Sequence, residues 1–192
     1  MFKKLYRILL KPDEFFEGIR EEGAQQPLVF FLQVSAIIAL FTPIVNYLGW
    51  PSTDQNSAYQ AQIMAWQITE EQLLPILGYW AYLVEAFLIL SLSLIVALFM
   101  TGFMHLIFRI LGGKGQILNA WKATCYGAGP CVLFGWIPYW SLFVAVWSLL
   151  LQFYYGPKVL YRMREGIALL ILAFIVGATL LELMTKGTTV GF

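Results

Sequence analysis

Long runs of apolar residues constrain this chain more than any other feature of its sequence. Five runs, separated by short polar segments, fall near residues 28–48, 76–108, 123–138, 140–157 and 167–185. A helix needs about 20 mainly apolar residues to cross a bilayer. Apolar residues make up 60% of the chain and charged residues 12%, whereas soluble domains hold about 45–50% and about 25%. The sequence therefore predicts an all-α integral membrane bundle of five transmembrane helices plus short interfacial helices.

The basic residues give the expected orientation of these crossings, because they avoid every second polar segment. Only Lys186 lies outside three basic segments, whose members are Lys3, Lys4, Arg7, Lys11, Arg20, Arg109, Lys114, Lys122, Lys158, Arg162 and Arg164. Short loops rich in Lys and Arg stay in the cytoplasm, so we expect the N-terminus inside and the C-terminus outside. A basic inner face suits anionic headgroups. The residues predicted to bind inner-leaflet lipids are Lys3, Lys4, Arg7, Lys11, Arg109, Lys158, Arg162 and Arg164.

The first 26 residues read as a cytoplasmic interfacial segment ahead of a membrane domain that covers residues 27–192. Apolar side chains recur at helical spacing on one side and basic side chains take the other: Phe2, Leu5, Tyr6 and Leu9, against Lys3, Lys4, Arg7 and Lys11. Such a helix lies in the headgroup plane. Pro12 fits the first turn of a second short helix. Two roles stay open for the segment, plain membrane anchoring and docking of a cytosolic partner.

The second apolar run, from Ile76 to Leu111, is longer than one perpendicular crossing requires. As a single helix it would reach about 50 Å, against a hydrocarbon core of about 30 Å. We therefore expect it to tilt, to protrude, or to break at Gly102 or Gly112–Gly113. The outer segment before it, residues 51–74, is expected to hold a short amphipathic helix between Tyr59 and Ile68. That segment is interpreted as a connector, with a ligand lid as the alternative.

The third apolar run is irregular, since Gly127, Gly129, Pro130 and Gly135 fall in it or beside it. Backbone carbonyls that a proline leaves unpaired cannot face lipid. We therefore predict a span broken near residues 127–130 that is buried among the other helices or lines a polar pocket.

Ionisable residues within the spans suggest where such a pocket lies. Glu85 and Glu182 fall in the outer half of the predicted bilayer, and Asn46 falls at the same depth. An ionisable group inside a span costs at least about 2.5–3.5 kcal/mol, so it usually faces a cavity, a partner or the interface. The predicted outward-open pocket, for a proton, a cation or a lipid headgroup, is formed by Asn46, Glu85, Tyr126, Pro130 and Glu182. The alternative is that each Glu reaches the outer interface.

Residues for catalysis or metal binding are scarce. The chain has one His and two Cys, and the spacing of His105, Cys125 and Cys131 matches no metal site. The glycine-rich turn at residues 112–115 follows a helix rather than a strand, so it is interpreted as a tight turn and not as a phosphate-binding loop. We therefore expect no catalytic residue, no metal ion, no cofactor and no enzymatic activity.

Several short motifs follow one another in a distinctive order. A Pro-x-x-Phe-Phe stretch (Pro12, Phe15, Phe16) precedes the first span, and a Gly-Gly-Lys-Gly turn follows the second. Tyr126 and Pro130 come next, and then the tetrapeptide Gly-Trp-Ile-Pro at 135–138. Together with the hydropathy profile, this order resembles the Yip domain family, the Ypt-interacting-protein membrane proteins, over nearly the whole chain.

The resemblance implies a five-helix membrane domain. In eukaryotic members it also implies binding to prenylated Rab-type GTPases and work in vesicle traffic. This chain has only a short N-terminal segment and lacks the Asp-Leu-Tyr-Gly-Pro motif of those members. It is therefore more similar to the short prokaryotic members, and we do not carry GTPase binding over to it.

Two classes of function remain open. The first is a non-catalytic adaptor or organiser in the plasma membrane of a prokaryote, which binds membrane lipids and other membrane proteins or a second copy of itself, and no nucleic acid. The alternative is a small transporter or channel with a polar pocket at the broken third span. Replacing Glu85 or Glu182 with Gln should be harmless in the first class and should abolish flux in the second.

Overall fold

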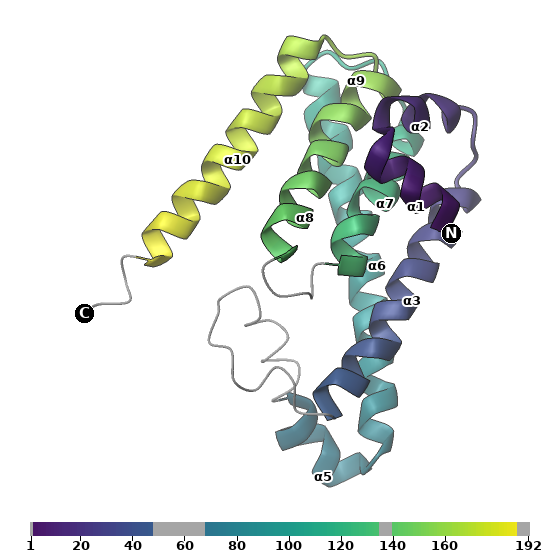
Figure 1. Cartoon of the computed structure of the whole chain (residues 1–192), viewed down its shortest axis with the longest axis vertical. Helices are drawn as coiled ribbons and strands as arrows, with labels where there is room; N and C mark the ends of the chain where they lie inside the picture. The colour runs from purple at the N-terminus through teal and green to yellow at the C-terminus, as the bar shows by residue number, and fades with distance from the viewer. Residues whose placement is uncertain (1, 48–67, 135–139, 188–192) are drawn as a thin grey trace.

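A computed structural model describes residues 2–47, 68–134 and 140–187, and all regular elements in these ranges are helical (Figure 1). The helical fold class predicted from the sequence is thus confirmed. Two helices are long and apolar enough to cross a membrane by length and composition, α3 (Gln25–Tyr47) and α6 (Trp80–Ile110). A shorter apolar stretch, Glu165–Ala178, begins α10 (Glu165–Gly187). Two of the five predicted spans therefore pass this test within the described residues.

The remaining elements are shorter. In chain order they are α1 (Phe2–Leu10), α2 (Pro12–Gly18), the π-helix η3 (Ile68–Leu73), α5 (Leu74–Leu77), α7 (Ile117–Phe134), α8 (Trp140–Leu150), the π-helix η4 (Leu151–Tyr155) and α9 (Gly156–Leu160). Pro12 occupies the first turn of α2, as predicted. Gly112 follows α6 with a φ of 86°, a left-handed conformation that favours glycine. The expected outer amphipathic helix between Tyr59 and Ile68 lies almost wholly outside the described residues.

Helix α7 is the centre of the bundle, in contact with α1, α3, α6, α8, η4 and α9. Small residues allow this close packing. A Cβ atom on Gly127 would lie 2.5 Å from Cγ of Gln152, and one on Gly129 would lie 2.7 Å from the ring of Phe30. The central position predicted for the third span is therefore what the structure shows.

The break predicted within that span is absent. Helix α7 runs without interruption from Ile117 past Pro130 to Phe134. Proline is tolerated in a packed helix when neighbouring side chains bond to the backbone around it. The hydroxyl of Ser148 donates a buried hydrogen bond of 2.5 Å to the carbonyl of Gly127, and the Gln152 amide donates to that hydroxyl at 3.1 Å. A helix that packs this closely against η4 keeps its geometry at the proline.

Helix α6 is also continuous and does not break at Gly102. One side of it packs on α3 and α7. Much of its remaining surface is apolar and exposed, through Leu83, Phe87, Leu88, Leu92, Ile95, Val96, Leu98, Phe99, Phe103, Leu106 and Ile110. So large an apolar surface is unusual on a protein surrounded by water and is suited to contact with lipid.

Candidate functional site

The N-terminal helices fold back onto one end of the bundle, where α1 and α2 lie against α7 and α9 (Figure 1). Leu5 and Ile8 of α1 and Phe15 and Phe16 of α2 are buried in the main hydrophobic core. The ring centroid of Phe15 lies 5.1 Å from that of Tyr126 on α7, in an edge-to-face arrangement. The first two helices therefore share one core with the rest of the chain.

This packing divides the apolar residues of α1 differently from the sequence prediction. Leu5 and Ile8 point into the bundle, whereas Phe2, Tyr6 and Leu10 form an exposed stripe. The prediction placed Phe2, Leu5 and Tyr6 on one common face. The division arises because α1 is apolar around much of its circumference, and only the bundle decides which part is covered.

A cluster of hydrogen-bonded polar side chains links α1 to α7. The ammonium of Lys4 donates to Oε1 of Glu22 and to the hydroxyl of Tyr126, both at 2.8 Å. The Tyr126 hydroxyl in turn donates to Oε2 of Glu22 at 2.5 Å. One residue from α1, one from the linker between α2 and α3 and one from α7 thus form a closed ring of hydrogen bonds.

The linker between α2 and α3, residues 19–24, is bonded to α7 at two further points. Lys122 donates to the carbonyl of Arg20 at 2.7 Å, and the Trp121 indole donates to the carbonyl of Ala24 at 3.2 Å. The Arg20 side chain donates to the carbonyl of Val159 on α9 at 2.6 Å. Lys122, which the charge pattern placed among the cytoplasmic basic residues, is therefore buried and serves to hold the linker.

A second charged cluster joins α2 to α9 and α10. The ammonium of Lys158 lies 3.4 Å from Oδ1 of Asp13 and 3.8 Å from Oε1 of Glu165, and Glu165 also accepts from the hydroxyl of Tyr154. Burial lowers the pKa of Lys158, whereas its neighbours, led by Asp13, raise it, and the net pKa lies above the ordinary value. Lys158 stays charged at neutral pH and links three helices.

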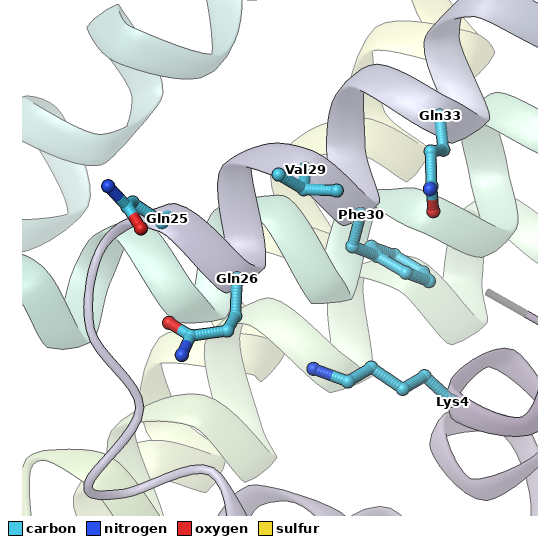
Figure 2. A pocket seen from close by; sticks show the side chains of 6 residues that line it. All are labelled: Lys4, Gln25, Gln26, Val29, Phe30 and Gln33. Atoms are coloured by element: carbon cyan, nitrogen blue, oxygen red, sulfur yellow. The ribbon is translucent and has the colours of Figure 1, made fainter.

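An open hollow of about 340 Å³ lies between α1 and the first turns of α3 (Figure 2). We call it the α1–α3 groove. Its lining residues are Lys4, Gln25, Gln26, Val29, Phe30 and Gln33. The groove therefore combines one ammonium, three amides and an apolar wall, and it adjoins the polar cluster through Lys4.

Comparison with known families decides what kind of chain carries this arrangement. The family model of the Yip1 domain matches residues 6–184. The chain belongs to the Yip1 domain family. No curated protein and no solved structure gives a significant match. The match begins within α1 at residue 6, so it includes Glu22, Tyr126 and Lys158 of the clusters described above but not Lys4.

Within this Yip1 domain, the members of the predicted polar pocket are not all neighbours. Tyr126 belongs to the cluster with Lys4 and Glu22. It packs in one core with Met104, whereas Glu85 precedes Met104 by 19 residues on α6, or about 28 Å of helix. Glu85 is itself buried. Tyr126 and Glu85 thus lie toward opposite ends of the bundle.

The structure describes the side chain of one of the other three members of that predicted pocket. Pro130 is buried in α7, one turn beyond Tyr126. The side chains of Asn46 and Glu182 lie outside those that the structure describes, so their predicted part in the pocket stays a prediction. Among the described residues, no three His, Cys, Asp or Glu side chains are grouped to hold a metal ion.

The basic residues predicted to meet inner-leaflet lipids divide into two sets. Lys4 and Lys158 are engaged in the clusters described above. Those with exposed side chains are Lys3, Arg7, Lys11, Arg109, Arg162 and Arg164. Sequence reasoning missed Glu22, whose partner Tyr126 is 104 positions away. No local pattern marks such a pair.

Proposed function

We propose that this protein is a non-catalytic adaptor of a prokaryotic plasma membrane, which crosses the bilayer five times and binds inner-leaflet lipids and other membrane proteins. The observation that carries the proposal is the exposed stripe on α1. Phe2, Tyr6 and Leu10 are 72%, 63% and 63% exposed, although the opposite side of the same helix is already buried. A second apolar surface on a docked helix offers a binding face for lipid or protein.

The position of the basic segments supports the proposed orientation. The turn after α6 meets the segment before α10, where the amide of Lys114 donates to the carbonyl of Tyr161 at 3.0 Å. His105 and the Tyr161 hydroxyl are hydrogen-bonded at 2.6 Å in the same region. Helices α1 and α2 lie at this end as well (Figure 1). The three basic segments therefore gather at one end of the bundle, as a cytoplasmic end requires.

Charge and apolar surface act together on α1. Lys3 and Arg7 are exposed beside the stripe, and each basic residue near an anionic leaflet contributes about 1 kcal/mol. Full burial of a large apolar side chain contributes about 1.5–3 kcal/mol. Because the bonds from α7 hold the linker, α1 presents this surface in a fixed direction. This fixed presentation favours an adaptor over a loose anchor.

Photo-crosslinking in native membranes tests the proposal on the full-length protein. A photoreactive phenylalanine analogue replaces Tyr6 in one variant and Glu17, an exposed residue of α2, in a matched control. We expect adducts of defined mass with lipid and with a membrane protein at position 6 and not at position 17. The double substitution Phe2→Ser and Leu10→Ser should remove the adducts at position 6.

Two results would contradict the proposal. Equal labelling at positions 6 and 17 would show that the stripe has no preferred partner. Adducts that survive the serine substitutions would show that the apolar surface of α1 does not carry the interaction.

A further inference from the structure

Both polar and apolar side chains line the α1–α3 groove. Lys4 of α1 contributes an ammonium, and α3 contributes the amides of Gln26 and Gln33 together with the apolar side chains of Val29 and Phe30. Figure 2 shows the side chains of Gln26, Phe30 and Gln33 extending from one side of α3 toward Lys4. Its volume of about 340 Å³ falls at the lower end of the range for small-molecule sites, about 300–1,000 Å³. The groove suits a ligand with a polar part and an apolar part.

The polar groups of the lining can bind a phosphate. An ammonium has three N–H donors, and among the described residues that of Lys4 donates to two acceptors, Glu22 and Tyr126. One donor remains for a ligand. The glutamine amides add neutral donors, and no carboxylate lines the groove. Phosphate oxygens form strong hydrogen bonds with such a charged donor.

The face of α3 that lines the groove continues along the helix beyond it. Gln26, Val29 and Gln33 are followed at intervals of three or four residues by Ile37, Leu40 and Ile44, which places all six on one face. The last three are 38%, 62% and 54% exposed. The face is mainly polar in the first turns of α3 and wholly apolar after Gln33. A phospholipid has the same order, with its headgroup first and its acyl chains beyond.

We propose that the α1–α3 groove binds the phosphate-bearing headgroup of one inner-leaflet phospholipid, while an acyl chain follows the exposed face of α3. This inference rests on the proposed function for one point only, the placement of α1 and the start of α3 at the inner leaflet. Lys4 is the single charged residue of the lining. The site therefore recognises the phosphate, and it accepts zwitterionic and anionic phospholipids alike.

Native mass spectrometry of the full-length protein in a mild detergent tests the proposal. Phosphatidylethanolamine or phosphatidylglycerol is added, and the lipid retained per chain is counted. The variant Val29→Trp fills the groove and leaves Lys4 in place. Leu98→Trp on α6 is the control, because Leu98 is 56% exposed and Val29 is 52% exposed.

We expect the wild type and Leu98→Trp to retain one molecule of either phospholipid. Val29→Trp should retain at least about ten-fold less, a change that corresponds to about 1.4 kcal/mol. The double variant Gln26→Leu and Gln33→Leu guards against misfolding at Val29. It should show a smaller preference for phospholipid over diacylglycerol, which has no phosphate, because only part of the polar lining is removed.

Three outcomes would overturn the proposal. Equal retention by Val29→Trp would show that the groove is not the site. Equal retention of diacylglycerol by the wild type would show that the phosphate is not recognised. Displacement of the lipid by excess inorganic phosphate would identify a soluble phosphate as the ligand.

The proposed adaptor function is tested separately. Val29→Trp should leave the cross-linking at position 6 unchanged, and Phe2→Ser with Leu10→Ser should leave the retained phospholipid unchanged. In the otherwise wild-type protein, absence of cross-linking at position 6 with phospholipid retained would refute the adaptor function alone, and cross-linking at position 6 without retained phospholipid would refute the lipid site alone.

Discussion

Replacing Tyr126 with Phe tests directly what holds α1 on the bundle. The substitution removes one hydroxyl, which accepts from Lys4 at 2.8 Å and donates to Glu22 at 2.5 Å. The ring keeps its contacts, because its centroid lies 5.1 Å from that of Phe15 and 5.0 Å from that of Phe30. The variant therefore isolates the polar part of the contact.

The magnitude follows from the partners of that hydroxyl. Hydrogen bonds to charged groups contribute about 1.5–3 kcal/mol each to stability. The ion pair between Lys4 and Glu22 survives the substitution, but these side chains are 36% and 21% exposed, and a partly exposed pair contributes about 0–1 kcal/mol. Because Lys4 and Glu22 stay paired and can bond to water after the substitution, we count one such bond rather than two. The resulting loss of about 1.5–3 kcal/mol corresponds to an increase of about 10- to 150-fold in the population with α1 detached.

Hydrogen exchange of the full-length protein in detergent measures this population. Amides of α1 and α2 should exchange about 10- to 150-fold faster in Tyr126→Phe, because exchange reports local opening and each factor of ten corresponds to about 1.4 kcal/mol. Helices α3 and α6 should keep their protection. Tyr154→Phe is the matched control, since it also removes a tyrosine hydroxyl bonded to a glutamate, in this case the exposed Glu165.

The reasoning fails if α1 keeps its protection in Tyr126→Phe, or if both variants accelerate exchange equally. A uniform loss of protection over the whole bundle would also refute it. That result would show that the hydroxyl stabilises α7 and not the docking of α1.

Three further predictions concern the bundle itself. Gly127→Ala should lower the thermal midpoint of unfolding, at a cost of about 1–3 kcal/mol from overpacking, because its Cβ would meet Gln152. Gly102→Ala should not lower the midpoint, because a Cβ there has open space around it. Equal midpoints for the two variants would contradict the close packing of α7. Burial raises the pKa of Tyr161 to about 12 from an ordinary 10, so the folded state keeps a proton that the unfolded state releases. The free energy of unfolding should therefore fall as the pH rises from 10 toward 12, by up to about 1.4 kcal/mol per pH unit. The unfolding midpoint of Tyr161→Phe should fall less than that of the wild type across this range. An equal fall in both proteins would refute the raised pKa of Tyr161. Glu85→Gln should leave the cross-linking at position 6 unchanged. If the wild type instead carries an ion flux in proteoliposomes and Glu85→Gln abolishes it, the result favours a transporter.

Local sequence patterns were sufficient for the helices and for several of their ends. Apolar runs predicted the helical class, and the order of short motifs indicated the family that the Yip1 match confirms. Pro12 marked the start of α2, and Gly112 marked the end of α6. These features depend on residues close in sequence, where the spacing of apolar side chains and the conformations of Gly and Pro dominate.

Contacts between distant segments could not be predicted in the same way. The apolar spacing of α1 did not distinguish Leu5, which is buried, from Tyr6, which is exposed. The charge pattern did not reveal that Lys122 bonds to the linker. In each case the deciding neighbour is about a hundred positions or more away, or lies on another helix.

The continuous helix α7, the third predicted span, shows how tertiary packing overrides a local preference. Pro130 alone favours a break, because proline removes one hydrogen bond and clashes with the preceding turn. The neighbouring helix provides the buried hydroxyl of Ser148 as a donor to the carbonyl of Gly127. The sequence contains both residues, but it does not show that they meet.

The length of α6 makes the fit between this protein and a bilayer depend on the thickness of that bilayer. Its 31 residues extend about 46 Å, whereas an average hydrocarbon core is about 30 Å thick. Transmembrane helices tilt by at most about 40°, so tilting does not remove the whole hydrophobic mismatch. With α6 crossing the bilayer as proposed, the surrounding bilayer must thicken or the helix must protrude, and both energetic costs decrease as the lipid chains become longer. In a membrane whose thickness varies, this protein should therefore accumulate in the thicker regions.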